Sequence, residues 1–109
     1  MTEPPELESV TFGILSWPDD LPDFTEAELA DLQERHVAYL QGLRERGILL
    51  AGGPLDDQAD ERLRGICFYA VGIEEARAAA EQDPSVRAGR LHIDVMTWYH
   101  LPGEAAFGA

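Results

Sequence analysis

The chain contains no lysine. All eight of its basic residues are arginine, against 21 aspartate and glutamate residues, and the formal net charge is −13. Without lysine there is no side-chain amine for Schiff-base chemistry and no lysine that could bind phosphate groups as in a P-loop. An excess of negative charge repels phosphate backbones and anionic membrane surfaces. Nucleic acids and membranes are therefore not expected as partners.

Cysteine and long apolar segments are also scarce. The single cysteine, Cys67, has no intrachain disulfide partner, which agrees with a reducing compartment. It lies in the apolar run 66–71, where we expect a buried structural thiol rather than a nucleophile. No stretch approaches the roughly 18–20 apolar residues of a membrane span. The acidic start of the chain lacks the features of a signal peptide, so the expected compartment is the cytoplasm.

The chain is long enough for one domain with a two-layer core. It has 109 residues, of which 45% are hydrophobic. The expected organisation is a flexible N-terminus at residues 1–9, a folded domain at 10–99 and a C-terminal tail at 100–109.

Hydrophobic patterning and capping signals divide this domain into six elements. Thr25 and Glu28 have the spacing of a capping box, and Gly47 suits the left-handed end of the same helix. Residues 52–54, Gly-Gly-Pro, are expected to close the second strand; their glycines also allow a ligand to approach the backbone amides. Asp83-Pro84 is expected to stop the second helix. Strands are predicted at 10–17, 48–51, 65–71 and 91–98, and helices at 26–46 and 73–82. This β-α-β-β-α-β order is that of an α+β, ferredoxin-like domain.

Two helices cover only one face of a four-stranded sheet. The first strand is apolar on both faces, and the second face of the last strand carries Met96 and Trp98. A second copy of the chain would cover this face. We therefore expect a homodimer in which two sheets face each other.

A histidine, His36, interrupts the apolar stripe of the first helix. A lone histidine in such a place is commonly a core residue bonded to a backbone carbonyl. Alternatively, a carboxylate bonded to one ring nitrogen fixes the tautomer and leaves the other nitrogen to act as acid or base. Asp83, Asp56 and Asp57, at the ends of elements, are the candidate partners. The residues alone leave both interpretations open.

Metal-ligating residue types are present but sparse. His92 and Asp94 share one face of the last strand, and His36 and Asp83 are further candidate ligands. A two-residue spacing on a strand is common by chance, and no third ligand is compelling, so no metal is expected. His100, after the last strand, is expected at the surface.

Together these motifs are similar to those of the YCII family. The resemblance extends from about residue 10 to residue 98 and is carried by the segments 36–40, 47–54, 74–76 and 83–90 and by Trp98. It implies a ferredoxin-like fold that forms a dimeric α+β barrel. It also implies a His36–Asp83 active-site pair, with Gly53 and Pro54 at the pocket wall. The resemblance also implies the chemistry that is assigned to some members of the family. That chemistry is dehydrochlorination of a chlorinated hydroxyhydroquinone without a metal or an organic cofactor. Ser85 replaces an aromatic residue that often follows Asp-Pro, which leaves the substrate unspecified.

Two functional hypotheses follow. The first is a lyase, dehydrochlorinase or isomerase acting on a small organic substrate without a cofactor. In it His36 transfers the proton, Asp83 orients the ring, amides near Gly53 stabilise a developing oxyanion, and unassigned arginines bind an acidic substrate. The second is a non-catalytic small-ligand-binding or accessory domain that uses the same pocket. Protein binding through the acidic surface is a third alternative.

Overall fold

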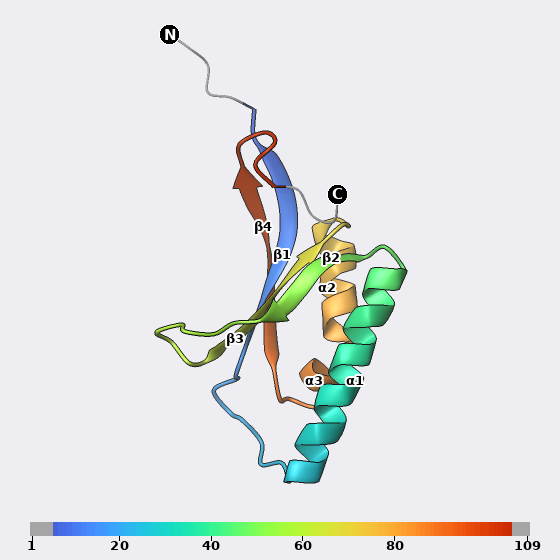
Figure 1. Ribbon diagram of the computed structural model, residues 1–109, viewed down its shortest axis with the longest axis vertical. Helices are drawn as coiled ribbons and strands as arrows, with labels where there is room; N and C mark the ends of the chain where they lie inside the picture. The colour runs from blue at the N-terminus through green and yellow to red at the C-terminus, as the bar shows by residue number, and fades with distance from the viewer. Residues whose placement is uncertain (1–5, 106–109) are drawn as a thin grey trace.

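A computed structural model describes residues 6–105, which form a four-stranded antiparallel sheet with three helices on one side (Figure 1). The elements are β1 (Glu8–Ser16), α1 (Glu26–Glu45), β2 (Leu49–Pro54), β3 (Leu63–Tyr69), α2 (Ile73–Glu81), α3 (Pro84–Arg87) and β4 (His92–His100). The strand order β2-β3-β1-β4 puts β1 and β3 in the middle of the sheet. This confirms the predicted α+β class and ferredoxin-like topology. Residues 1–5 and 106–109 of the expected terminal segments lie outside the described residues.

The first helix begins and ends as its capping residues predict. The Thr25 hydroxyl accepts a hydrogen bond from the Glu28 N–H (3.1 Å), and the Glu28 carboxylate accepts one from the Thr25 N–H (3.0 Å). Gly47, at φ +74°, turns the chain out of α1 in the left-handed region that glycine adopts easily. None of the helices within residues 6–105 is both long and apolar enough to cross a membrane.

Small side chains on the covered face of the sheet let the helices pack closely. Ala76 and Ala80 of α2 are buried there beside Cys67. A Cβ on Gly65 would lie 3.0 Å from the Gly53 carbonyl oxygen, so this position requires glycine to bring β2 and β3 together. Burial raises the pKa of the Cys67 thiol to about 11, which agrees with the expected structural, unreactive cysteine.

The bounds of all four strands differ from the sequence-based prediction by one to three residues, and β4 includes His100. Two differences bear on the site. Residues 52–54 do not close β2; they belong to it and pair with residues 65–67 of β3. A proline is tolerated there because β2 is an edge strand. Asp83-Pro84 ends α2 but also starts α3, an unpredicted element with proline in its first turn. Proline suits this position because its missing N–H would have no partner within the helix.

No helix of the described residues covers the opposite face of the sheet (Figure 1). This face carries a row of aromatic side chains. Phe12 stacks on Phe68 with ring centroids 5.9 Å apart, and Phe68 lies 6.3 Å from Trp98. Trp98 is 41% exposed. His100, expected at the surface, is instead buried. Its ring lies 5.1 Å from that of Trp98, and its Nδ1 lies 2.9 Å from the Leu101 carbonyl oxygen.

Candidate functional site

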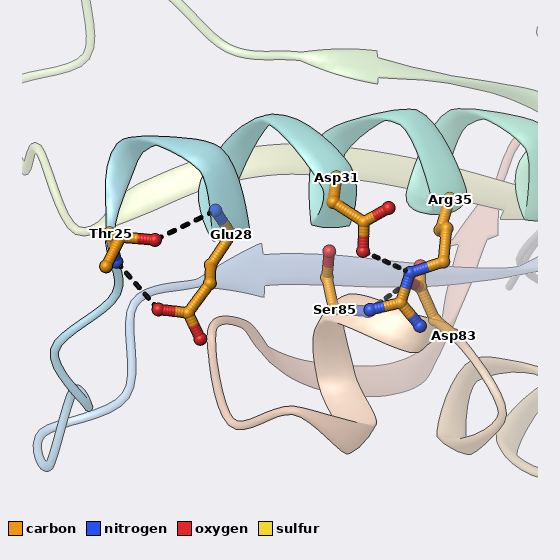
Figure 2. A network of polar contacts seen from close by, with 6 residues as sticks. All are labelled: Thr25, Glu28, Asp31, Arg35, Asp83 and Ser85. Atoms are coloured by element: carbon orange, nitrogen blue, oxygen red, sulfur yellow. Dashed lines mark hydrogen bonds and ion pairs between the residues drawn. The ribbon is translucent and has the colours of Figure 1, made fainter.

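One carboxylate joins the start of α3 to the histidine of α1. Asp83 is the N-cap of α3, and its Oδ1 accepts a hydrogen bond from the Ser85 N–H at 2.9 Å. Its Oδ2 lies 2.6 Å from Nδ1 of His36. Figure 2 shows Asp83 and Ser85 next to α1, with the bond that caps α3. Of the three carboxylates considered as partners, Asp83 is the one that contacts His36. Asp56 and Asp57 are exposed in the loop after β2, where the Asp57 N–H donates to the Asp56 side chain.

The contact between His36 and Asp83 is buried, and the hydrogen-bonding capacity of the two groups determines which atom carries the hydrogen between them. His36 is 9% exposed and Asp83 is 3% exposed. A carboxylate only accepts hydrogen bonds, so Nδ1 of His36 carries the hydrogen of the bond to Asp83. A neutral ring held in this way has its lone pair on Nε2. In that tautomer Nε2 is the acceptor nitrogen of the ring.

His36 lies in the wall of a cavity of about 600 Å³, called here the His36 cavity. The cavity is lined by residues 29–40 of α1, the end of β2, the start of β3, Trp17 after β1, and the segment from α3 to β4. Its lining comprises Trp17, Leu29, Ala30, Leu32, Gln33, His36, Val37, Leu40, Gly52, Gly53, Pro54, Arg64, Gly65, Ser85, Arg90 and Leu91. Gly53 and Pro54 thus lie in the same wall as His36, although their role toward a substrate stays a prediction. No described atom lies within 4 Å of the position of a Cβ on Gly53, so that side of the backbone is open.

Other titratable groups near Asp83 are poorly suited to act as bases. The Tyr39 hydroxyl donates to the Ala79 carbonyl oxygen (2.7 Å), which ties α1 to α2, and burial raises the pKa of this phenol. Burial also raises the pKa values of Tyr69 and Cys67. These three groups therefore stay protonated at neutral pH, and none of them is among the lining residues of the His36 cavity.

Trp17, Arg64 and Arg90 are lining residues that the sequence did not single out individually. The guanidinium carbons of Arg64 and Arg90 lie 4.4 Å and 5.6 Å from the centre of a Trp17 ring. Trp17 follows the end of β1, Arg64 lies on β3 and Arg90 precedes β4. These positions are distant in sequence, and no local motif connects them. Ser85 was noted in the sequence only as a departure from the aromatic residue that often follows Asp-Pro, and α3, which holds it in place, was not predicted.

No group of three or more histidine, cysteine, aspartate or glutamate side chains in residues 6–105 is arranged to hold a metal ion. His92 is exposed and lines a separate hollow beside Asp60 and Arg62. It therefore does not join the His36–Asp83 contact.

Comparison with known proteins gives a family match and a similar fold. The family model described as YCII-related domain matches residues 14–99. Among solved structures, the 5-chloro-2-hydroxyhydroquinone dehydrochlorinase from Burkholderia phenoliruptrix AC1100, in complex with 2,5-dihydroxybenzoquinone, is similar in fold with a TM-score of 0.56. The two sequences are 24% identical, and the match covers 83% of this chain and 94% of that chain. At this identity the likeness shows the fold alone. No curated protein matches significantly.

Proposed function

Because this chain belongs to the YCII-related domain family, we propose that it is a small enzyme that uses His36 and Asp83 for acid/base chemistry on a compact organic substrate. The observation that carries this proposal is the 2.6 Å contact between His36 Nδ1 and Asp83 Oδ2 in the wall of the His36 cavity. A cavity of about 600 Å³ is in the size range of small-molecule sites. The similar fold of a dehydrochlorinase gives the proposal a chemical precedent.

In the proposed reaction, Nε2 of His36 removes a proton from a hydroxyl or from a carbon next to a carbonyl group of the substrate. Asp83 keeps the ring in the required tautomer and stabilises the imidazolium that forms. In a lyase, the freed electron pair forms a double bond and expels a leaving group such as chloride. In an isomerase, the substrate takes the proton back at another atom. Backbone amides near Gly53 would stabilise negative charge on a substrate oxygen. Neither reaction requires an external oxidant or reductant.

The proposal predicts that His36→Asn removes turnover and leaves the fold intact. Asparagine retains a polar group close to the position of Nδ1 but cannot serve as the base. The assay uses a panel of small enolisable and phenolic compounds, including 5-chloro-2-hydroxyhydroquinone. Mass spectrometry in D₂O follows deuterium incorporation and product formation, and ion chromatography follows chloride. Circular dichroism and thermal unfolding report whether the variant is folded.

Three results decide between the hypotheses. Turnover by the natural protein that is lost in folded His36→Asn supports the enzyme. Undiminished turnover in the variant rules out His36 as the base. If compounds of the panel bind tightly but neither react nor exchange protons, the non-catalytic ligand-binding domain is the correct function.

We also propose that the aromatic face of the sheet pairs two copies of the chain. Phe12, Phe68 and Trp98 form a continuous row on this face, and Trp98 is 41% exposed. Large apolar side chains gathered on one face are typical of protein interfaces. Light scattering at micromolar concentration should give the mass of a dimer, and Trp98→Glu should give a monomer. A monomeric natural protein would contradict the pairing.

The cytoplasm is the proposed compartment, since Cys67 is a buried free thiol and the described residues hold no disulfide. Fractionation of the cells that make the protein should recover it with soluble cytoplasmic markers. Recovery from the culture medium or from an oxidising compartment would contradict this location.

A further inference from the structure

Two arginines, Arg64 and Arg90, line the His36 cavity. All other arginines of the chain are exposed, whereas Arg64 and Arg90 are half-buried. Ion pairs with carboxylates are made by Arg35, Arg62 and Arg77. Neither Arg64 nor Arg90 makes one with any carboxylate of residues 6–105, although the chain has 21 acidic residues.

An irregularity of the sheet accounts for the place of Arg64. In the pairing of β1 with β3, Leu15 lies opposite Gly65 and Ser16 lies opposite Leu63, so Arg64 is the extra residue of a β-bulge. Strict alternation from the buried Gly65 would put Arg64 on the aromatic face of the sheet. A bulge redirects a side chain, and Arg64 lines the His36 cavity. One of its N–H groups donates to the Glu61 carbonyl oxygen at 2.8 Å, which holds it in position.

The two guanidinium groups are held near one another by a shared aromatic ring system. Their carbons lie 4.4 Å and 5.6 Å from a ring centroid of Trp17, within the range of cation–π attraction. Two like charges brought together in a partly desolvated place repel each other. An anion between or beside them would relieve this repulsion, and guanidinium groups bind carboxylate and other oxyanions through paired N–H donors.

From this geometry we infer that Arg64 and Arg90 select a substrate that carries an anionic oxygen group, and that they hold it by that group. The inference rests on the proposed function and names the substrate class of the same site. Leu32, Val37 and Leu40 are among the apolar residues of the lining. The ligand is accordingly a small acid, carboxylate or phenolate, with an apolar or ring-shaped body. Binding of its charged end at the arginines directs the body toward His36.

The test compares anions with neutral molecules of nearly the same shape, by isothermal titration calorimetry at low ionic strength. Benzoate is paired with benzamide, and 4-nitrophenolate at pH 8 with 4-nitroanisole. The anion of at least one pair should bind about tenfold more tightly than its neutral counterpart, as expected for a charge-assisted contact. The pair that shows the larger preference identifies the acid as a carboxylate or a phenolate.

The variants Arg64→Gln and Arg90→Gln should each weaken anion binding by about tenfold and leave binding of the neutral compound unchanged. Arg64→Lys, which keeps the charge, should retain part of the preference. Arg62→Gln is the matched control, because Arg62 is exposed and paired with Asp60. If neither anion binds more tightly than its neutral counterpart, or if Arg62→Gln weakens the anion as much as the other variants, the inference is wrong.

The same titrations with His36→Asn separate this inference from the proposed function. Anion preference in that variant together with wild-type-like turnover would leave the arginine site standing and remove His36 as the base. If His36→Asn loses turnover but the natural protein shows no anion preference, His36 remains the base and the arginine site is ruled out.

Discussion

Two helices of this protein begin with the same chemical device in different surroundings (Figure 2). At the start of α1, Thr25 and Glu28 exchange hydrogen bonds with each other's backbone, and both residues are exposed. At the start of α3, the buried Asp83 accepts the Ser85 N–H with one oxygen. Its other oxygen contacts His36, 47 positions earlier in the chain. The cap of α1 bonds only backbone N–H groups at the start of α1, whereas the cap of α3 also connects α3 to His36, the candidate base.

The difference is informative because α3 has only four residues. A helix of that length is not stable on its own account, since forming the first turn costs more than its single bond returns. Its stability depends on packing and on Asp83. By contrast α1 has 20 residues and a buried face, so its cap is one contribution among many. Changes at Asp83 should therefore affect stability and chemistry together, while changes at Thr25 or Glu28 should affect stability alone.

The largest expected effect comes from Asp83. Asp83→Ala removes the cap of α3 and leaves His36 buried without its partner. It should lower the free energy of unfolding by about 3–5 kcal/mol, as for a broken buried pair. Asp83→Asn keeps an acceptor for the Ser85 N–H and should cost about 1–2 kcal/mol. Turnover should nevertheless fall on the order of a thousandfold, because an amide cannot hold the required tautomer or stabilise an imidazolium.

Urea denaturation and steady-state rates measure these two effects separately. An Asp83→Ala variant that loses no more stability than Thr25→Ala would remove the distinction between the two caps. Full activity in folded Asp83→Asn would show that the carboxylate has no part in the chemistry.

The same contrast explains which features the sequence could predict. The capping box of α1 is readable because Thr25 and Glu28 are three positions apart and act on each other. The contact of His36 with Asp83 spans 47 positions, and the residues alone left Asp56 and Asp57 as equal candidates. Only the family resemblance singled out Asp83, and in the structure the two side chains are in contact.

The features that the sequence did not predict depend on pairing between strands. Residues 52–54 look like a turn by composition, but they pair with residues 65–67 of β3, where a Cβ on Gly65 would lie 3.0 Å from the Gly53 carbonyl oxygen. Arg64 reaches the cavity through a bulge, which changes the face of the sheet to which a residue points. Alternation counted along one strand contains no information about such a shift.

A smaller effect is expected from Thr25. Thr25→Ala removes the hydroxyl acceptor for the Glu28 N–H and should lower the free energy of unfolding by about 1 kcal/mol. Thr25→Ser retains the acceptor and is the matched control. Neither substitution should alter turnover, since the two hydrogen bonds of the cap join Thr25 and Glu28 to each other. A parallel loss of activity and stability in Thr25→Ala would mean that the start of α1 also positions His36.

The smallest effect concerns pH and the second half of the capping box. The bond from the Thr25 N–H, together with the Thr25 side chain, lowers the pKa of Glu28 below its usual 4.5. A folded-state pKa below the unfolded value means that the contribution of the carboxylate is present above about pH 4.5. It is lost as the pH falls through the folded-state value.

Glu28→Gln keeps an oxygen acceptor but does not titrate, so the natural protein should be the more stable one at pH 6. The difference should shrink as urea titrations are repeated toward pH 3. The lowered pKa of Asp60, caused by Arg62, is common to both proteins and cancels in the comparison. A difference that stays constant from pH 6 to pH 3 would mean that the cap depends on the shape of the Glu28 side chain and not on its charge.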